Sequence, residues 1–548
     1  MILGVWNGHN SSVAIGVDGE LKYAALEERF CRKKFVRAFP HAALNAGLET
    51  LSISPKDITV VACGAFASPS KDAVSEFLSA SKDLDQQMVA ARLYHSLLSD
   101  KDYRVELIAE VSKRFPGAKL KFYDHHESHA ASAFYFSNFE DASLLTADGR
   151  GDLQSLVVWT ADRVGGLRRV FTNSELGSLG ALYGQVTGAL GFTPDRHEGK
   201  VTGLAAYGEQ TELVDRFLEL LHFDGEKIRI GPRFTPFLRP TGNEFKQLIQ
   251  GYTREDVAYA VQTVLERTVL GVLQRFVPKE SNLCLAGGIF ANVKLNQRVR
   301  EAGYRNIFVF PEMGDGGNSV GGLALAAAEA GEICAPLNSV RLGPEFIWRE
   351  ENSDGMSSTY FEDQDELISC VVDLIIAGKI VGLFCDRMEF GPRALGSRSI
   401  LLSATDPSVN DSVNRRLNRT EFMPFAPVTL EREAEKMFMG LSAGGDTNTR
   451  FMTTCYPCTQ LMKDLSPAAV HIDGTARPQI INENNSPRLY YKILQAYWKK
   501  TGIPSLLNTS FNNHEEPIVC SPTDAVDSLR RDNIDLIATE KYLIRRFL

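Results

Sequence analysis

The strongest constraint on the fold of this chain is a β-rich unit that occurs twice. The first copy is predicted as three strands, over residues 2–6, 12–17 and 20–26. Its last two strands flank Asp18-Gly19, a dipeptide that favours the type I′ turn of a hairpin. The second copy is predicted as strands over residues 142–147 and 153–160, with Asp148-Gly149 between them. Two related β-units predict an internally duplicated fold.

Two strand–loop–helix units lie further along the chain. In the first, a strand over 283–286 runs into Gly287-Gly288, and a helix is predicted over 291–302. In the second, a strand over 306–310 is followed by the loop MGDGGNSVGG and another helix. A glycine loop before a helix lets backbone N–H groups approach a phosphate at the positive end of that helix. Tight turns alone explain each loop, but their repetition predicts adenine nucleotide binding.

The length of the chain predicts more than one domain. Its 548 residues exceed the roughly 250–300 residues at which a single hydrophobic core stops growing. Residues 335–359 lose periodicity and gather proline, asparagine, aspartate and glycine, which is typical of a connector. Beyond it, a helix over 366–377 and a strand over 379–385 indicate another α/β unit. We therefore expect domains over 1–350 and 360–548.

Charge and hydropathy argue against several classes of partner. The formal net charge is -9 and the pI about 5.7, so the overall field repels a phosphate backbone. The N-terminus lacks a basic region followed by a continuous apolar stretch. No apolar run approaches the roughly 18 residues that suggest a membrane span. We expect a cytoplasmic protein that acts on small molecules, with no nucleic acid or membrane partner.

Four side chains form a candidate metal site. His125 and His129 are spaced i, i+4 and would share one face of a helix. Asp148 and Asp315 each follow a predicted strand, where a side chain projects toward a crevice beyond the sheet. Two imidazoles and two carboxylates suit iron, manganese or zinc, and the sequence does not choose among them. Singly, the histidines could be core or cap residues and each aspartate a turn residue, but their combination favours a metal site.

Arginines and neutral donors cluster in the C-terminal part of the chain. They are Arg393 and Arg398 in GPRALGSRS, then Arg415, Arg416 and Arg419, Arg477 in HIDGTARPQ, and Asn508, Ser510 and Asn512 in LLNTSFNN. Arginine forks suit polyphosphate and carboxylate groups. Because the chain is acidic overall, the cluster indicates a pocket for a bound anion, with solvated surface arginines as the alternative.

His9 lies where the first predicted strand ends. A histidine there could take a proton from a hydroxyl group in a transition state. Ordinary hydrogen bonding at a strand end explains it as well, so His9 alone does not establish catalysis.

Together, the motifs resemble the O-carbamoyltransferase family. In order along nearly the whole chain, they are GHNSSVAIGVDG, EERFCRKKF, DHHESHAASAF, EGKVTGLAAYG, AGGIFAN, EFGPRALGSRSIL, HIDGTARPQ and LLNTSFNNHEEPIVC. Members of this family modify antibiotics and acceptors similar to Nod factors. The resemblance implies an α/β protein with an N-terminal Kae1-like domain, which has the duplicated actin/Hsp70/sugar-kinase fold, followed by a C-terminal YrdC-like α/β domain.

The resemblance implies a first half-reaction in the YrdC-like domain. There, carbamoyl phosphate and ATP, accompanied by magnesium, would give carbamoyl adenylate through carbamate, with release of phosphate and pyrophosphate. The residues implied to bind ATP and carbamoyl phosphate are Arg393, Arg398, Arg419, Arg477, Asn508, Ser510 and Asn512.

A second half-reaction is implied in the Kae1-like domain. A divalent metal, for which the resemblance favours Fe(II), would hold and polarise the adenylate while an acceptor hydroxyl attacks and AMP leaves. The metal ligands would be His125, His129, Asp148 and Asp315. The adenylate would contact Asp148, Gly149, Ser178, Gly287, Gly288, Asn292, Asp315 and Ser319. His9 matches the catalytic histidine of the family, and Asn7 and Lys34 match its acceptor-binding residues.

Three positions depart from the family pattern. Asn10 stands where many relatives have aspartate, Met423 where many have arginine, and Asp152 where glutamate is commoner.

A sugar or acid kinase with the same N-terminal fold is an alternative function, against which the motifs GPRALG and NTSFN argue. Carbamoyl transfer to tRNA is disfavoured by the net charge of -9, and transfer to a hydrogenase maturation partner by the lack of multiple CxxC zinc segments. The acceptor and the oligomeric state stay open.

Overall fold

The computed structural model describes residues 1–66, 69–83, 86–231, 244–304, 306–353, 355–417, 422–442 and 445–547. These residues form two compact α/β units. The first unit comprises Met1–Lys22, Arg37–His41 and Ser52–Leu337, and the second comprises Tyr23–Val36, Ala42–Leu51 and Asn338–Leu548. The second unit thus includes segments from the N-terminal part of the chain, which chain order alone does not predict.

The first of two five-stranded sheets has the strand order β3-β2-β1-β4-β5. Its strands are β1 (Ile2–Trp6), β2 (Ser12–Val17), β3 (Glu20–Leu26), β4 (Val60–Cys63) and β5 (Lys119–Phe122). β1 pairs antiparallel with β2 and parallel with β4, and β4 pairs parallel with β5. Asp18 and Gly19, with φ angles of 51° and 74°, form the predicted type I′ turn.

The second five-stranded sheet repeats this topology. Its strands are β6 (Asp141–Gly151), β7 (Gln154–Asp162), β8 (Gly166–Ser174), β11 (Asn282–Ala286) and β12 (Asn306–Val309). Read from β8, the order is β8-β7-β6-β11-β12, with β6 antiparallel to β7 and parallel to β11. Each sheet is therefore a three-strand meander with two parallel strands added beside its first strand. This repeat confirms the internally duplicated, actin-like α/β fold.

The turn of the second meander does not lie where the sequence placed it. Asp148-Gly149 is part of β6, whose last residue pairs with the first residue of β7. The turn is formed by Asp152 and Leu153, with φ angles of 47° and 67°. The register between β6 and β7 shifts just after Ala147, so the Asp-Gly pair forms an irregular stretch of strand.

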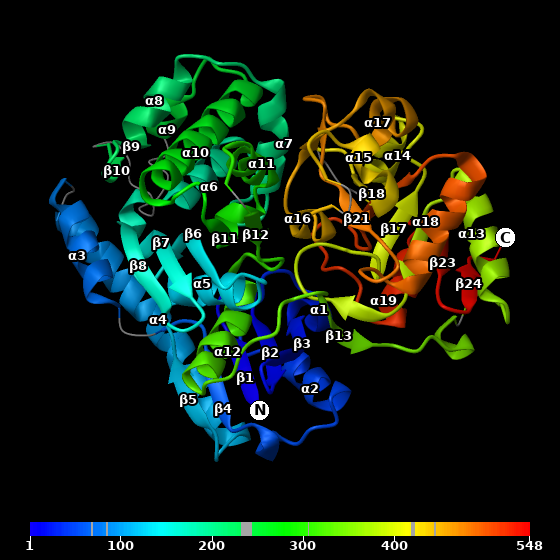
Figure 1. Ribbon diagram of the computed structural model, residues 1–548, viewed down its shortest axis with the longest axis horizontal. Helices are drawn as coiled ribbons and strands as arrows, with labels where there is room; N and C mark the ends of the chain where they lie inside the picture. The colour runs from blue at the N-terminus through cyan, green and yellow to red at the C-terminus, as the bar shows by residue number, and fades with distance from the viewer. Residues whose placement is uncertain are drawn as a thin grey trace. The chain divides into compact units, whose positions relative to one another are not determined.

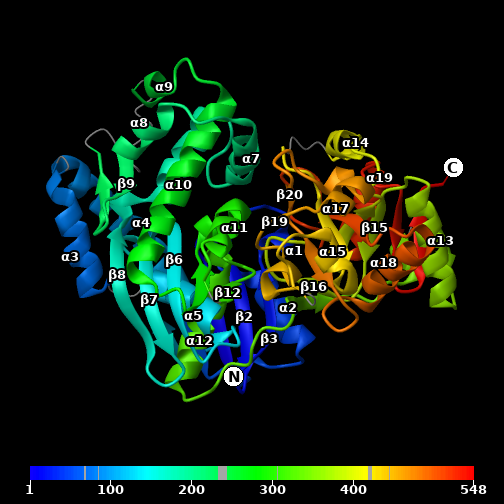
Figure 2. The same cartoon turned by 45° about the horizontal axis from the view of Figure 1, so that its top comes forward.

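Helices α5 (His125–Tyr135) and α12 (Asn318–Glu329) follow the last strand of each sheet and pack against each other. Figures 1 and 2 show them side by side. A Cβ atom on Gly321 of α12 would lie 1.9 Å from a backbone oxygen of α5, and one on Gly4 would lie 1.9 Å from the backbone oxygen of Ser319. Glycine at these positions lets α12 touch both α5 and β1, which fixes the two halves of the first unit relative to each other.

Further helices and a two-stranded sheet complete the first unit. The remaining elements of this unit are α3 (Lys71–Ala80), α4 (Gln86–Arg114), α6 (Leu179–Ala189), α7 (Glu198–Leu204), α8 (Leu213–Leu220), β9 (Leu221–Phe223), β10 (Ile228–Ile230), α9 (Glu244–Leu248), α10 (Arg254–Phe276) and α11 (Val293–Glu301). α10 begins after Thr253, whose hydroxyl accepts a hydrogen bond from the backbone N–H of Asp256 at 3.1 Å.

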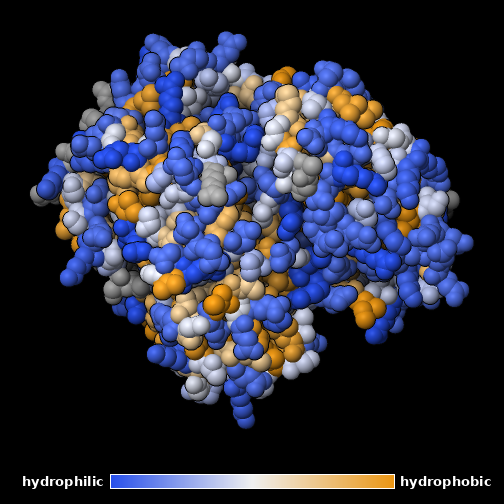
Figure 3. Space-filling view, in the orientation of Figure 1, coloured by the Kyte–Doolittle hydropathy of each residue, from blue (hydrophilic) through white to orange (hydrophobic). Residues whose placement is uncertain are grey.

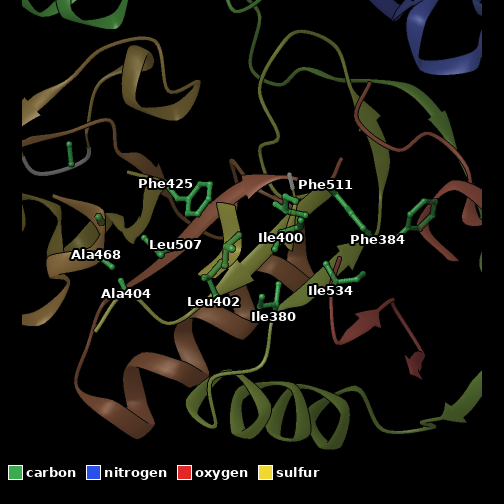
Figure 4. Close-up of a cluster of buried hydrophobic side chains, with 14 of the residues drawn as sticks. Ile380, Phe384, Ile400, Leu402, Ala404, Phe425, Ala468, Leu507, Phe511 and Ile534 are labelled. Atoms are coloured by element: carbon green, nitrogen blue, oxygen red, sulfur yellow. The ribbon is translucent and has the colours of Figure 1, made fainter. Parts of the chain in front are cut away.

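The second unit is built on an eight-stranded mixed sheet with the order β14-β24-β23-β15-β17-β22-β18-β21. Its strands are β14 (Ser357–Tyr360), β15 (Val381–Phe384), β17 (Arg398–Leu402), β18 (Ala426–Leu430), β21 (Gln479–Ile481), β22 (Ser505–Ser510), β23 (Leu536–Ala538) and β24 (Tyr542–Arg545). Alternate side chains enter separate cores, as the pleat requires. Ile400 and Leu402 lie in the core that Figure 4 shows, and Leu401 lies in the other.

Helices α13 (Gln364–Ile376) and α18 (Arg488–Thr501) pack against each other and supply apolar residues to that other core. The remaining elements of the second unit include α1 (Glu28–Cys31), α2 (His41–Thr50), β16 (Arg387–Glu389), α14 (Val409–Arg416), α15 (Ala434–Met437), α16 (Thr447–Arg450), β19 (Tyr456–Pro457), α17 (Gln460–Leu465), β20 (Thr475–Ala476) and α19 (Pro522–Arg530). The predicted connector over 335–359 is not wholly irregular. It contains β13 (Arg341–Glu345), which pairs with β16, and most of β14.

The surface is largely polar in the view of Figure 3, with hydrophobic side chains scattered among hydrophilic ones. Scattered apolar groups of this kind are normal on a protein surface. Among the described helices, none is long and apolar enough to cross a membrane.

Candidate metal centre and anion-binding loops

Helix α5 carries both histidines of the predicted metal site, and its first turn is fixed from two sides. Asp124 caps the helix by accepting a hydrogen bond from the backbone N–H of Glu127 at 2.9 Å. Asp152, in the turn between β6 and β7, accepts one from the backbone N–H of His125 at 2.8 Å. His125 and His129 are buried, one helical turn apart. The structure thus confirms the helix that the spacing of the two histidines predicted.

The two aspartates come from the second half of the same unit. Asp315 begins the 3-10 turn η6 (Asp315–Gly317), which leads into α12. Asp148 lies in the irregular stretch of β6, so the prediction that it follows the end of a strand is wrong. A Cβ atom on Gly288 would lie 3.1 Å from a carboxylate oxygen of Asp148. Glycine at this position therefore leaves room for the carboxylate.

The structure brings the four predicted ligands together, with one ligand atom of each within 4.8 Å of the others. The Nε2 atom of His129 lies 3.0 Å from Asp148 Oδ2, 3.1 Å from His125 Nε2 and 3.6 Å from Asp315 Oδ1. The Nε2 atom of His125 lies 3.4 Å from Asp315 Oδ1 and 3.7 Å from Asp148 Oδ2. An ion about 2.0–2.2 Å from each ligand places neighbouring ligand atoms about 3–3.5 Å apart. The donor set and its spacing fit a divalent cation.

The cluster holds opposite charges in a buried place, which shifts the pKa values of its members. Burial lowers the pKa of His125, but the carboxylates of Asp315 and Asp148 outweigh this effect and raise the pKa to about 9. Burial also disfavours the charged form of Asp148, but hydrogen bonds from His125 and His129 hold its pKa well below the usual range. The two carboxylates therefore favour a positive charge between them, whether a proton on His125 or a metal ion.

Asn318, in the first turn of α12, contacts the other ring nitrogen of His125. Its side-chain amide nitrogen lies 3.4 Å from His125 Nδ1, and its buried amide oxygen has no hydrogen-bond partner among the described residues. Rotating the amide by half a turn would place the oxygen at Nδ1, where it can accept a hydrogen bond from an Nδ1–H group. Nδ1 then carries the hydrogen, and Nε2 presents its lone pair to a metal ion.

Several residues predicted to bind an adenylate lie around Asp148. Gly287 has a φ angle of 102°, and a Cβ atom there would lie 2.1 Å from the backbone oxygen of Ala147. Only glycine fits this approach. Ser178 caps α6 and donates a hydrogen bond to the backbone oxygen of Gly149 at 2.6 Å. Gly149, Ser178, Gly287 and Gly288 therefore gather beside the metal-ligand cluster.

The other two predicted adenylate residues have different neighbours. Asn292 caps α11 and exchanges hydrogen bonds with the side chain of Gln262 at 2.7 and 3.3 Å. Ser319 accepts a hydrogen bond from the hydroxyl of Ser12 at 2.8 Å and donates one to the backbone oxygen of Gly316 at 3.2 Å. Ser319 thus lies beside the turn of Asp315, whereas Asn292 faces α10.

Asn7 and His9 follow β1, as the sequence placed them. Asn7 is fully buried, and its amide nitrogen donates to the backbone oxygen of Tyr103 at 2.9 Å and to the carboxylate of Glu106 at 3.1 Å. His9 is partly exposed. Lys34 lies in the second unit, shortly after α1. The proposed roles of Asn7, His9 and Lys34 stay predictions.

Asn10 is the departure from the family pattern beside His9. Its φ angle is 62°, and its amide nitrogen lies 3.3 Å from a carboxylate oxygen of the buried Glu312. Asparagine can donate a hydrogen bond to this carboxylate, whereas an ionised aspartate would repel it.

In the second unit, pairing between β17 and β22 brings two motif loops together. GPRALGSRS leads into β17 and LLNTSFNN spans β22 and its end, with Ser399 opposite Ser510. The amide nitrogen of Asn508 donates to the backbone oxygen of Ala394 at 3.0 Å. Arg393 therefore stands on a loop tied directly to Asn508. Further predicted anion-binding residues lie as follows: Ser510 ends β22, Asn512 follows it, Arg477 follows β20, and Arg419 is outside the described residues.

Arg398 has mainly structural contacts. Its side chain is completely buried, and its guanidinium carbon lies 3.7 Å from the centre of the Phe384 ring. Through Nε and Nη1 it donates to the backbone oxygens of Cys385, Asp386, Ser397 and Cys520. Only Nη2 is left for the anion contact that the sequence predicted.

Family models for both ends of carbamoyltransferases match the chain. The model described as carbamoyltransferase N-terminus matches residues 1–325, and the model described as carbamoyltransferase C-terminus matches residues 372–546. The chain belongs to the carbamoyltransferase family. The family predicted from the motifs is thereby confirmed, and with it a transferase activity.

Relatives of this carbamoyltransferase span its whole length. It is 32% identical over 559 residues to the nodulation protein NolNO of Sinorhizobium fredii (strain NBRC 101917 / NGR234), covering 98% of the chain and 79% of that protein. It is 29% identical over 560 residues to the uncharacterized protein MJ1051 of Methanocaldococcus jannaschii, covering 100% of both. The structure of HypF from T. kodakarensis matches 61% of the chain and 48% of HypF at 14% identity, with a TM-score of 0.35.

Two residues of this carbamoyltransferase were missed by the motif analysis. Asn318 stands shortly after Asp315 in MGDGGNSVGG, so its position near a predicted ligand was a usable signal. Glu389 is buried and accepts hydrogen bonds from three backbone N–H groups of the loop that carries Arg393. Glu389 is the first residue of the motif EFGPRALGSRSIL, but its role was not predictable, because backbone partners carry no sequence signal.

Proposed function

We propose that this carbamoyltransferase uses ATP and carbamoyl phosphate to carbamoylate a hydroxyl group of a small-molecule acceptor. The observation that carries the proposal is the convergence of His125, His129, Asp148 and Asp315 on one point. A divalent cation there, beside glycine loops that suit phosphate, fits an adenylate bound for group transfer. The family resemblance supports a natural-product or sugar-like acceptor.

The first half-reaction is assigned to the loops of the second unit. Carbamoyl phosphate and water give carbamate and phosphate. A carbamate oxygen then attacks the α-phosphorus of ATP. The bond from that phosphorus to the oxygen that bridges it to the β-phosphorus breaks, so pyrophosphate leaves and carbamoyl adenylate is formed. Arg393 and Arg477 are proposed to bind the phosphates, because guanidinium forks match phosphate oxygens. Magnesium is expected to accompany ATP.

The second half-reaction is assigned to the first unit. The adenylate would bind beside Gly149, Ser178 and Gly287, with its carbamoyl group toward the cluster of His125, His129, Asp148 and Asp315. A divalent ion held by these four residues would supply the positive charge that polarises the carbamoyl carbonyl. The donor set suits Fe(II), which the resemblance favours, and also manganese or zinc.

His9 is proposed to complete the transfer. Its imidazole would accept the proton of the acceptor hydroxyl while the hydroxyl oxygen attacks the carbamoyl carbon. The bond between that carbon and the phosphate oxygen breaks, so AMP leaves and the acceptor keeps the carbamoyl group. Histidine is a common general base in group transfer, because a neutral imidazole nitrogen can accept a proton.

A product analysis of the purified full-length protein tests the proposal. With ATP, magnesium and carbamoyl phosphate, we expect release of phosphate and pyrophosphate and detection of carbamoyl adenylate by mass spectrometry, before any acceptor is added. Formation of ADP alone would contradict the proposal and indicate a kinase. Screening hydroxylated metabolites for AMP release would then identify the acceptor.

A further inference from the structure

Helix α1 belongs to the second unit and directs one arginine to the loop that carries Arg393. Arg29 is 2% exposed, and its Nη2 donates to the backbone oxygen of Gly391 at 2.6 Å. Gly391 opens the GPRALGSRS loop and lies 362 positions further along the chain. A residue from the N-terminal part of the sequence therefore holds the backbone of a C-terminal loop.

Arg32, the C-cap residue that follows α1, holds a second loop of the same unit. Its Nη1 and Nη2 atoms donate to the backbone oxygens of Ile518 and Pro517, each at 2.7 Å. Its Nε lies 3.4 Å from a carboxylate oxygen of Asp524, whose other oxygen accepts two backbone N–H groups at the start of α19. Arg32 thus fixes the loop that joins β22 to α19.

The loop of Arg393 is also held by side chains from two short strands, β16 and β21. Glu389, which is 2% exposed, accepts hydrogen bonds through one oxygen from the backbone N–H groups of Leu395, Ser397 and Arg398, at 2.9, 2.7 and 3.2 Å. Gln479 donates to the backbone oxygen of Leu395 at 3.0 Å. The buried side chains of Arg29, Glu389 and Gln479 therefore all bind this loop, although it has no regular secondary structure.

Burying the charged side chain of Arg29 costs free energy, which argues that this residue does more than fill space. Burial lowers the pKa of Arg29, and the nearby carboxylates of Glu28 and Glu389 oppose this effect. A four-residue helix such as α1 is not stable by itself, so its place depends on its contacts. Both of its arginines are directed to loops that carry, or directly follow, residues proposed to bind phosphate. A displacement of about 1 Å in such groups lowers a rate by about a hundredfold.

We propose that Arg29 and Arg32 are positioning residues for the adenylate-forming site. They hold the loop of Arg393 and the loop after β22 in fixed places, so residues from the N-terminal part of the chain complete a site whose phosphate-binding groups come from the C-terminal part. This inference rests on the proposed function, because it takes the two loops to be the place of adenylate formation.

The test compares full-length variants in the first half-reaction. In Arg29→Ala, we expect kcat for pyrophosphate release from ATP and carbamoyl phosphate to fall about tenfold to a hundredfold, because a hydrogen bond from a charged donor is lost. Arg29→Lys should recover part of this loss, since an ammonium group can still reach one carbonyl oxygen. Arg37→Ala is the matched control, because Arg37 is an exposed arginine from the same stretch of sequence. It should behave like the wild type.

Hydrogen exchange provides a measurement that does not depend on activity. In Arg29→Ala, amide exchange should become about tenfold faster in peptides that cover residues 391–398, while peptides from α10 and the metal content stay at wild-type values. An unchanged kcat, a loss equal to that in Arg37→Ala, or unchanged exchange over 391–398 would each overturn the inference. Wild-type protein that forms no adenylate would instead contradict the proposed function, and the exchange comparison would still test the bracing of the loop.

Discussion

The two units of this carbamoyltransferase bury charge in different ways. In the first unit, the ligand atoms of His125, His129, Asp148 and Asp315 face one another. In the second, the loop-bracing arginines face backbone oxygens, and they are Arg29, Arg32 and Arg398. Backbone oxygens are acceptors at every pH and need no further ligand to bind a guanidinium group, whereas four converging titratable groups need a proton or a metal ion between them. The arginines of the second unit therefore hold the structure, whereas the four titratable groups of the first unit are arranged to bind a cation.

The largest effect is expected from removing a ligand of the metal centre. His129→Ala should lose the metal and slow acceptor carbamoylation by more than roughly a hundredfold. Loss of a residue that only hydrogen-bonds to a metal ligand already lowers metal affinity or activity by about tenfold to a hundredfold. Adenylate formation in the second unit should continue. Metal analysis and the two half-reactions, assayed separately, measure these effects.

His126→Ala is the matched control for this prediction. His126 is the buried neighbour of His125 on α5, but its Nδ1 lies 3.0 Å from the hydroxyl of Thr146, and burial lowers its pKa. This variant should keep the metal. A His129→Ala protein that retains both metal and transfer would show that the converging groups are structural after all.

A loop-bracing arginine should matter for stability in a way that an exposed one does not. Arg398→Met leaves buried backbone oxygens without donors, and we expect the free energy of unfolding to fall by about 3–5 kcal/mol. Arg393→Met, at a partly exposed position on the adjoining loop, should change it by less than about 1 kcal/mol and mainly slow adenylate formation. Urea unfolding monitored by fluorescence measures both. Equal free energies of unfolding in the two variants would show that Arg398 contributes no more to stability than Arg393 does.

The pH dependence of metal binding tests the titratable groups of the first unit. His125 has a pKa of about 9 in the folded, metal-free protein, so a metal ion must displace its proton below that pH. We expect metal affinity to rise by about tenfold per pH unit between roughly pH 7 and 9, and to level off above. Calorimetric titration at constant ionic strength measures this slope.

The proton on His125 that competes with the metal ion also stabilises the folded, metal-free protein. The folded pKa of about 9 lies above the ordinary value of 6.5, so this contribution to stability is complete below pH 6.5 and is lost as the pH rises through 9. The urea midpoint of metal-free protein should therefore fall across this range. A flat profile in both experiments would show that His125 does not carry the charge assigned to it.

The smallest effect is expected at Asn318, which contacts a ligand rather than the metal. Asn318→Ala should weaken metal affinity by about tenfold, because Nδ1 of His125 loses the partner that orients the ring. Asn318→Asp keeps an acceptor and should retain most of the affinity. Competition with a coloured chelator measures the difference, and equal affinity in wild type and Asn318→Ala would exclude this role.

Local sequence preferences predicted one of two similar turns. Asp18-Gly19 forms the expected hairpin, because both residues tolerate a positive φ angle and the flanking strands end there. Asp148-Gly149 has the same preference, but β6 continues through it and the turn forms at Asp152. Pairing with β7 sets this register, and pairing across strands is not encoded in a dipeptide.

The candidate site was predictable where side chains interact with one another. The i, i+4 spacing of His125 and His129 identified a shared helical face, and two aspartates near glycine loops suggested their partners. The structural contacts of Arg398, which the sequence assigned to anion binding, and those of Glu389 were not predictable, because their partners are backbone groups that every residue offers. The place of α1 in the second unit was equally hidden, since chain order does not show which core a segment joins.

The contacts of Arg32 also constrain how the chain is made. Arg32 and Ile518, which it binds, lie 486 positions apart, and ribosomes add about 5–20 residues per second, so roughly 25–100 s separate the synthesis of the two. During that interval α1 has been synthesised, whereas the loop that Arg32 binds has not. The second unit therefore joins segments whose synthesis is separated by 486 residues, so a chain truncated before Pro517 leaves an early segment without its partner.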